Sequence, residues 1–432
     1  MTRTFLRRGL WFLGTAVALS AQDTIPVRDL TLAAAHALAL NNQPRFAIAQ
    51  LQTAIAQENV RAARSTFLPA VNAYVSGVRA GNENTRILAG GLNNPSIYDR
   101  LAGGLAVSQL LTDFGRTGNL SASAKLQAQA QMQNTAATRE QVLLNVDIAY
   151  YDTLEAAAVL RVAQQTLATR QLLVNQMSAL SRSQLRSDLD VSFAQVAFEE
   201  AQVLVQKAEG QEGIAQAALG AALGFHDPQQ FKLEDAAAPP EAVADYSVLL
   251  NTALRERPEI LSLRDERDAA ARFARAEKDL SYPTVSAVGA VGDAPDHDVH
   301  LASHYAAGGV QLSVPLFAGG LDSARQHAAE LKRQIATQNL RDAEDNVVRD
   351  VRAAWLNFKT AATELQTTDQ LVKHANEAFT LAQARYKIGS SSIIELSQAQ
   401  LEATSAQIEH ADALYAMLIQ HSLLDYQVGT LR

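Results

Sequence analysis

Between residues 296 and 304 the chain gathers side chains that could hold a metal ion. Asp296, His297, Asp298, His300 and His304 offer imidazole nitrogens and carboxylate oxygens, and both groups are common ligands of transition metals. The run falls between two predicted strands, however, where a polar loop is expected in any case. A solvated loop explains these residues without a metal, so we predict no metal site and leave the role of the histidines open.

A second motif, Asp113-Phe114-Gly115, spells the metal-binding triplet of protein kinases. The triplet has that meaning only beside a glycine-rich phosphate loop, a strand lysine and a catalytic loop, and none of these patterns accompanies it. The chain has no cysteine, which excludes thiol catalysis, and no serine lies in a nucleophile-elbow pattern. We therefore predict that the protein is not an enzyme and uses no cofactor.

The composition favours long helices over a compact catalytic core. Of the 432 residues 6% are aromatic, Ala and Gln are abundant, and the formal net charge is -8 at pH 7. An acidic chain without basic clusters lacks the surface that binds nucleic acid. We exclude nucleic acid as a partner.

The first twenty residues have the pattern of a secretory signal. Arg3, Arg7 and Arg8 precede an apolar run over residues 9–19, and small residues follow it, as in signal peptides. A membrane anchor is the alternative, but the run is shorter than the ~20 residues that a spanning helix needs. We predict a signal peptide at residues 1–20 and export from the cytoplasm, with no lipid anchor because no cysteine could accept an acyl chain.

The elements that follow are encoded twice. Residues 108–224 map without a gap onto residues 313–429 at an offset of 205, and upstream the offset becomes 214. A register held over so many residues indicates an internal duplication, with one loop of different length. We predict a first structural repeat at residues 21–225, a proline-containing linker at 226–242, and a second repeat at 243–432.

Each repeat is predicted to run as two short helices, a strand, a loop, a strand and two long helices. In the first repeat we place helices at 27–40 and 45–66, strands at 71–78 and 101–111 around a loop at 81–95, and long helices at 117–180 and 188–223. In the second we place helices at 246–255 and 259–280, strands at 284–292 and 305–314, and long helices at 322–386 and 392–428. The helix at 117–180 would be about 95 Å long at ~1.5 Å per residue, which a compact domain could not enclose.

The long helix of the second repeat carries an apolar seam. Its members alternate at spacings of three and four residues: Leu365, Thr368, Val372, Ala375, Phe379, Ala382 and Tyr386. Such a seam is typical of helices that pack side by side. We predict that the long helices pair along their length.

The predicted strands alternate between an apolar face and a face of small or polar residues. In the strand at 101–111, for example, Leu105 and Val107 fall on one face and Ala106 and Ser108 on the other. The lipid and lumen sides of a membrane barrel give this pattern, and so do strands that cover a soluble core. The strand lengths also suit a tilted membrane strand.

Four strands per chain cannot close a barrel of useful width. Open strand edges are not tolerated in hydrocarbon, so membrane-spanning strands would require several chains to share one barrel. Three copies give twelve strands, within the even-numbered range of such barrels. The membrane interpretation therefore requires an oligomer.

The combined pattern resembles the TolC family of outer-membrane efflux proteins. The resemblance rests on the duplicated strand pair and helical hairpin, on residues 111–116 (LTDFGR) and 314–320 (VPLFAGG) after matching strands, and on Ala384-Arg385-Tyr386 with Gly389 before Glu395. It implies a fold that is mainly α with transmembrane β: a homotrimer with a twelve-stranded barrel in outer-membrane lipid, continuous with a long α-helical tube through the periplasm. It also implies a periplasmic adaptor and a proton-driven or ATP-driven inner-membrane pump as partners.

The resemblance also implies a gate at the inner end of the helical tube. Asp190 and Glu395 are 205 residues apart, at matching positions of the two hairpins, and in a trimer six such carboxylates would attract cations. Tyr386 matches a tyrosine that closes the family's gate, with Asp190 as its implied partner. The alternatives are acidic residues that favour a helix dipole and a tyrosine packed in the seam. Ser391 and Gln398 stand where relatives carry charged gate residues.

Two further features of the hairpin turns are left as expectations. Whether Arg182 or Arg186 supplies the missing basic gate residue is open. Ile388, Gly389 and Ser390 resemble the family's adaptor-contacting turn. Ser183, Gln184 and Leu185 occupy the other turn and lack the glycine. The alternative for both turns is a simple helix end, for which Gly389 suits a C-cap.

The function that follows is an outer-membrane channel of a tripartite efflux system, a passive conduit for drugs or other small toxic compounds. The alternatives are the outer component of type I protein secretion and, with less support, a periplasmic adaptor-type coiled-coil protein. An adaptor usually has one hairpin between compact β-rich domains and would not duplicate the strand pair. The exported substrate cannot be read from the chain.

Overall fold

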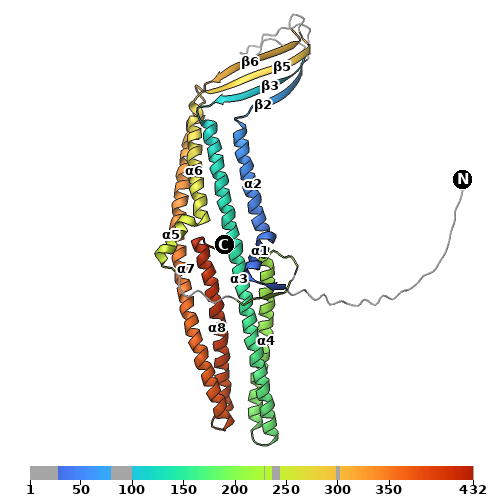
Figure 1. The fold of residues 1–432 in the computed structure, drawn as a ribbon, viewed down its shortest axis with the longest axis vertical. Coiled ribbons are helices and arrows are strands. Elements are labelled where there is room, and N and C mark those ends of the chain that lie inside the picture. Colours follow the sequence, from blue (N-terminus) through green and yellow to red (C-terminus); the bar gives the residue numbers. More distant parts are fainter. Residues whose placement is uncertain (1–27, 79–99, 228, 236–243, 298–301, 432) are drawn as a thin grey trace, which may run out of the picture.

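A computed structural model describes residues 28–78, 100–227, 229–235, 244–297 and 302–431. The chain forms a long rod of helices with a curved sheet at one end (Figure 1). This is the mainly helical fold with a few strands that the sequence predicts. The predicted signal peptide and the loop at 81–95 lie outside the described residues, as do residues 298–301.

The first repeat begins with a strand where we predicted a helix. Residues 27–40 were expected to be one helix, but Arg28–Leu30 form strand β1 and helix α1 spans Leu32–Asn42. The hydroxyl of Thr31 accepts a hydrogen bond from the Ala34 N–H at 3.1 Å, and this cap fixes the helix start after the strand. Helix α2 follows at Pro44–Ser65.

The segment predicted as a linker contains a strand of its own. Strand β4, Phe231–Leu233, pairs in parallel with β1. The Tyr150 hydroxyl donates to the carbonyls of Leu30 and Glu234, at 3.1 and 2.9 Å. Strand β1 and the segment between the repeats are therefore joined halfway along the rod.

The long helices repeat with the register of the sequence. Helix α3 spans Arg116–Arg182 and α7 spans Leu321–Lys387, each of 67 residues, so both ends are displaced by the offset of 205. Helix α4 spans Asp188–Ala222 and α8 spans Ile393–Val428. The second repeat also has α5 at Tyr246–Glu256, α6 at Pro258–Lys278 and a short 3-10 turn at Asp279–Ser281. Among the described helices, none carries an apolar stretch long enough to cross a membrane.

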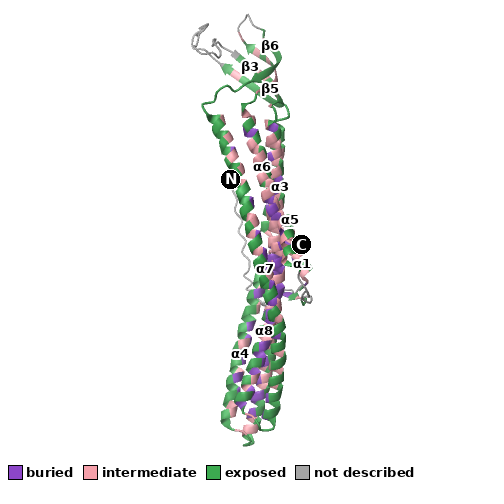
Figure 2. Cartoon of the chain, turned by 90° about the vertical axis from the view of Figure 1, so that its left-hand side faces the viewer, coloured by how far each residue is buried: buried purple, intermediate pink, exposed green. Residues whose placement is uncertain are grey.

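Apolar side chains hold the long helices together along most of the rod. Every member of the predicted seam from Leu365 to Tyr386 is buried or half-buried, which confirms the seam. One core near the middle joins α1, α3, α4 and α8, another joins α5, α6, α7 and α8, and a third lies near the hairpin ends. Figure 2 shows the buried residues around the middle of the rod and between the helices of the lower half.

The sheet contains two strands from each repeat. Strands β2 (Ala70–Val78), β3 (Arg100–Thr112), β5 (Thr284–Asp296) and β6 (His304–Ser313) are all antiparallel and lie in the order β2-β3-β5-β6. Strand β5 extends four residues beyond the predicted end at 292. Strands β2 and β6 therefore form the two edges of the described sheet.

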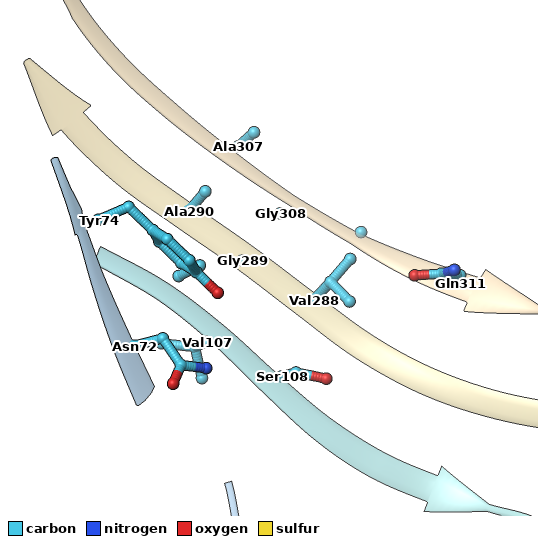
Figure 3. A pocket seen from close by; sticks show the side chains of 12 residues that line it. Asn72, Tyr74, Val107, Ser108, Val288, Gly289, Ala290, Ala307, Gly308 and Gln311 are labelled. Carbon is cyan, nitrogen blue, oxygen red and sulfur yellow. The ribbon is translucent and has the colours of Figure 1, made fainter. Parts of the chain in front are cut away.

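The two faces of the sheet differ in chemistry. The strand register places one set of exposed apolar side chains on the same face: Val71, Val75, Leu105, Val107, Val291, Val310 and Leu312. The opposite face carries Asn72, Ser108 and Gln311, together with Tyr74 and Val288, among alanines and glycines. These residues line a hollow of about 590 Å³ (Figure 3).

One row across the sheet joins two tyrosines through two glycines. Tyr74, Gly104, Gly292 and Tyr305 are paired neighbours on successive strands. A Cβ placed on Gly292 would lie 2.5 Å from the Gly103 carbonyl oxygen and even closer to the Tyr305 ring. The tyrosine ring therefore covers backbone that no side chain protects, as aromatic residues do beside glycine in sheets.

Candidate functional site

The two hairpin turns lie together at the end of the rod opposite the sheet (Figure 1). Each turn requires one residue in the left-handed region: Gln184 has φ 58° and Gly389 has φ 78°. These residues are 205 apart, so the first turn keeps the backbone of the second although it lacks the glycine. The six predicted adaptor-contacting residues at 183–185 and 388–390 are all exposed, and the Ile388 side chain is 81% exposed.

Asp190 caps the helix in which it lies. The Ser187 hydroxyl accepts from the Asp190 N–H at 3.3 Å, and the Ser187 N–H donates to the Asp190 carboxylate at 3.4 Å. This reciprocal pair is a capping box at the start of α4. The helix-stabilising role that the sequence left as an alternative is therefore present within the chain.

Glu395 occupies the matching place in the second hairpin and has a cationic neighbour. The Ser392 hydroxyl accepts from the Glu395 N–H at 3.2 Å. The Glu395 carboxylate lies 3.0 Å from the Arg385 guanidinium, and both side chains are about half exposed. The resemblance did not draw attention to Arg385 as a charge partner, although it lies next to Tyr386 in the sequence.

Tyr386 is buried between the hairpins, with 5% of its surface exposed. Its hydroxyl donates to the Met177 sulfur at 2.9 Å. Between Tyr386 and Asp190, both within the described residues, there is no hydrogen bond. Burial raises the pKa of Tyr386, while Arg186 lowers it and Asp190 raises it, so the phenol stays a neutral donor at physiological pH.

Arg186, and not Arg182, is the basic residue that contacts Tyr386. Its guanidinium carbon lies 4.6 Å from the centroid of the Tyr386 ring, and its Nη2 donates to the Tyr386 carbonyl at 3.3 Å. Arg182 instead donates to the carbonyl of Ser178 in its own helix, at 3.2 Å. The two arginines of this turn thus differ: Arg186 reaches the other hairpin, and Arg182 contacts its own.

The two motifs that suggested metal chemistry lie far from the hairpin turns. Asp113 lies three residues before the first residue of α3, and its carboxylate accepts from the Thr117 N–H at 2.7 Å, so the kinase-like triplet is the turn that leads into a helix. His304 lies 3.0 Å from Asp293 near the outer end of the β5–β6 pair, and Asp298 and His300 lie outside the described residues. Within the described ranges, no cluster of three or more metal-ligating side chains is present.

Comparison with known proteins places this geometry in a family. The model of the family described as outer membrane efflux protein matches residues 36–225 and 249–429. The chain is 25% identical to the outer membrane protein TolC of Vibrio cholerae over 91% of this chain and 89% of that protein. It is 26% identical to the toluene efflux pump outer membrane protein TtgC of Pseudomonas putida, over 85% and 76%.

Solved membrane proteins share the fold. A membrane protein from Pseudomonas aeruginosa superposes with a TM-score of 0.79 at 23% identity, covering 92% of this chain and 93% of that one. The open-state MtrE outer membrane channel of Neisseria gonorrhoeae superposes with a TM-score of 0.76 at 21% identity, covering 93% and 89%. The match to the family model spans both repeats, and the chain accordingly belongs to the outer membrane efflux protein family, whose members are outer-membrane channels with a long periplasmic helical extension.

Proposed function

We propose that three copies of this chain form the outer-membrane conduit of a tripartite efflux system. The observation that carries the proposal is the four-stranded sheet with two edges, β2 and β6. Each edge presents unpaired backbone groups, which hydrocarbon does not tolerate. Pairing of β6 with β2 of the next copy would satisfy both edges, and three copies would close a twelve-stranded barrel.

The side chains on and below the sheet support a membrane position. The apolar face described above would lie against lipid, and the face with Asn72 and Gln311 would line the lumen. An exposed aromatic residue stands at each of the four junctions between the sheet and the helices: Phe67, Phe114, Tyr282 and Phe317. Aromatic side chains are enriched at membrane interfaces, so these four would mark the periplasmic boundary of the bilayer.

At the other end of the rod the hairpin turns would form the gate. Asp190 and Glu395 would contribute six carboxylates around the axis of the trimer, and Tyr386 would hold the two hairpins of a chain together. To separate the hairpins, a partner would have to break the contacts of Tyr386 with Met177 and Arg186, each of which is individually weak. The exposed turns at 183–185 and 388–390 would bind a periplasmic adaptor, which in turn would recruit an inner-membrane pump.

The cargo that we propose is a drug or another small toxic compound. The relatives include a toluene efflux pump component, TtgC, and the cation efflux system protein CusC of Escherichia coli. Such a conduit would be passive, and we infer no catalytic activity for the chain. Type I protein secretion is the second candidate, because the same outer component could serve an ATP-driven transporter.

Cell fractionation tests the proposal. We expect the protein in the outer-membrane fraction, extracted by detergent as an oligomer that migrates as a trimer unheated and as a monomer after boiling. Recovery as a soluble periplasmic protein without detergent would contradict the channel and favour an adaptor-type protein.

A further inference from the structure

The C-terminal end of α7 is contacted by a side chain from the other hairpin. Tyr386 lies in the last turn of α7, where carbonyl groups lack partners within the helix. The Gly389 N–H donates to the Tyr386 carbonyl at 3.1 Å, and Arg186 donates to the same oxygen, which has two lone pairs. A cation at this position also interacts favourably with the negative end of the helix dipole.

The same arginine covers the Tyr386 ring. A guanidinium 4.6 Å from the ring centroid is within the range of a cation–π contact. On another side, the Tyr386 hydroxyl is held by Met177, which is 2% exposed. Tyr386 belongs to the second repeat, whereas Arg186 and Met177 belong to the first. One buried residue is therefore contacted by the opposite hairpin at its ring, its hydroxyl and its backbone carbonyl.

This arrangement occurs once per chain. At the offset of 205, Arg186 corresponds to Ser391 and Tyr386 corresponds to Ser181, so the reciprocal contact cannot form. The side chains at these four positions are the clearest chemical difference between the two turns, whose backbones otherwise match. Because of this asymmetry, the first hairpin contacts the end of α7 through Arg186, and among the described residues the second hairpin has no matching contact to the end of α3.

We propose that Arg186 is a positioning residue of the gate, which fastens Tyr386 and the end of α7 to the first hairpin and thereby keeps the two hairpin turns of a chain together. This inference rests on the proposed function. Separation of the turns requires the guanidinium to leave both the ring and the carbonyl. Loss of Arg186 therefore favours the open channel and leaves the width of the open pore unchanged.

Single-channel recording of the full-length protein in planar bilayers tests the role of Arg186. We expect Arg186→Ala to raise the open probability roughly two- to fivefold, the range for one exposed cation–π contact, with the same conductance in the open state. Arg186→Lys keeps the charge but not the planar fork, so it should restore part of the closure. Arg182→Ala removes the same charge from the same turn and is the matched control, with an expected open probability equal to that of the wild type.

A variant of the tyrosine separates the two sets of contacts. Tyr386→Phe keeps the ring and the backbone carbonyl that Arg186 contacts. It loses only the hydroxyl, and with it the hydrogen bond to the Met177 sulfur. The Arg186→Ala effect should therefore persist in the Tyr386→Phe background. In Tyr386→Leu, which has no aromatic ring, the effect should shrink because the two changes remove the same contact.

Each outcome either supports or overturns the role of Arg186. Equal open probability for Arg186→Ala and Arg182→Ala, in channels of normal conductance, would overturn this role and leave the channel itself intact. The role would also be overturned if Arg186→Lys opens as often as Arg186→Ala and both trimers dissociate at a lower temperature, since a purely structural defect would explain that result. Absence of any channel activity in the wild-type protein would overturn the proposed function and this inference with it.

Discussion

The carboxylate of Glu395 lies 3.0 Å from the guanidinium of Arg385, one residue before Tyr386. An ion pair at this place means that the proposed ring of carboxylates is partly neutralised within each chain. Water screens exposed pairs strongly, so the pair should exchange readily with ions in the channel. The charge that a cation meets at the gate therefore depends on both residues.

Opposite effects on cation block are expected from the two members of this pair. Glu395→Ala should weaken block of the channel by multivalent cations, because it removes three carboxylates from the trimer. Arg385→Ala should strengthen block, because it frees the same carboxylates. Blocking constants measured in planar bilayers check both changes, and Lys387→Ala serves as the control for loss of a nearby positive charge. An unchanged constant in Glu395→Ala would rule out the proposed ring of carboxylates.

The row of glycines in the sheet gives a prediction about barrel stability. A Cβ at Gly292 would meet both the Tyr305 ring and the Gly103 carbonyl, and overpacking of this kind typically costs about 1–3 kcal/mol. Gly292→Ala should lower the temperature at which the trimer dissociates on unboiled gels. Gly289→Ala, on the same inner strand β5, is the matched control, because a Cβ there meets only the Ala307 carbonyl oxygen, at an ordinary contact distance of 3.7 Å. Equal dissociation temperatures for the two variants would argue against the close packing of Tyr305.

A glutamate in the middle of the rod predicts a pH dependence of stability. Burial, followed by the charges of Asp412 and Asp152, raises the pKa of Glu155 from 4.5 to about 7. Below pH 4.5 the residue is protonated in both the folded and the unfolded state. As the pH rises from there to about 7, the unfolded state loses its proton first, so the free energy of unfolding should fall.

Thermal unfolding followed by circular dichroism at several pH values checks this sign. Glu155→Gln should be more stable than the wild type at pH 8 and similar to it at pH 4, and its pH dependence should be shallower. Some dependence should remain, since burial also raises the pKa of Glu140 to about 7. Glu209→Gln, at an exposed position on α4, is the control and should follow the wild type. Stability that rises between pH 5 and pH 7 would contradict the burial of Glu155.

The sequence predicted those parts of the fold whose pattern repeats over many residues. The offset of 205 and the seam ending at Tyr386 extend over many turns of helix, so single exceptions do not hide them. Strands β1 and β4 were missed because three residues are too few to show an alternating pattern, and pairing between them depends on contacts far apart in the chain. The αL conformation of Gln184 was equally hidden, since it follows from the shape of the turn and not from the residue type.

At the candidate gate, the sequence predicted where the residues lie along the helices but not which partners their side chains contact. Asp190, Glu395 and Tyr386 lie at the hairpin ends as the resemblance implies, but the Tyr386 hydroxyl donates to Met177. A sulfur acceptor leaves no signature in a sequence because methionine is common in helix cores. Arg186 could have been found by comparing the two turns, since the offset pairs it with Ser391.

The proposed barrel requires β6 of one chain to pair with β2 of the next until three chains close it. The chain has no cysteine, so engineered pairs can be oxidised without competing thiols. Strands β3 and β5 lie between β2 and β6 within a chain, so the two edges are three strand spacings apart, or ~14 Å at ~4.8 Å per spacing. A disulfide needs Cα atoms less than about 7 Å apart. Only pairs between neighbouring chains can form.

Oxidative cross-linking of β2 to β6 in outer membranes detects this pairing. Asn72→Cys would be combined in turn with Ala307→Cys, Gly309→Cys and Gln311→Cys, which share one face of β6, and the products separated on denaturing gels. We predict that one combination links chains into dimers and trimers, with three chains as the largest product. Monomer alone in all three combinations, or a ladder that continues beyond three chains, would contradict the shared barrel.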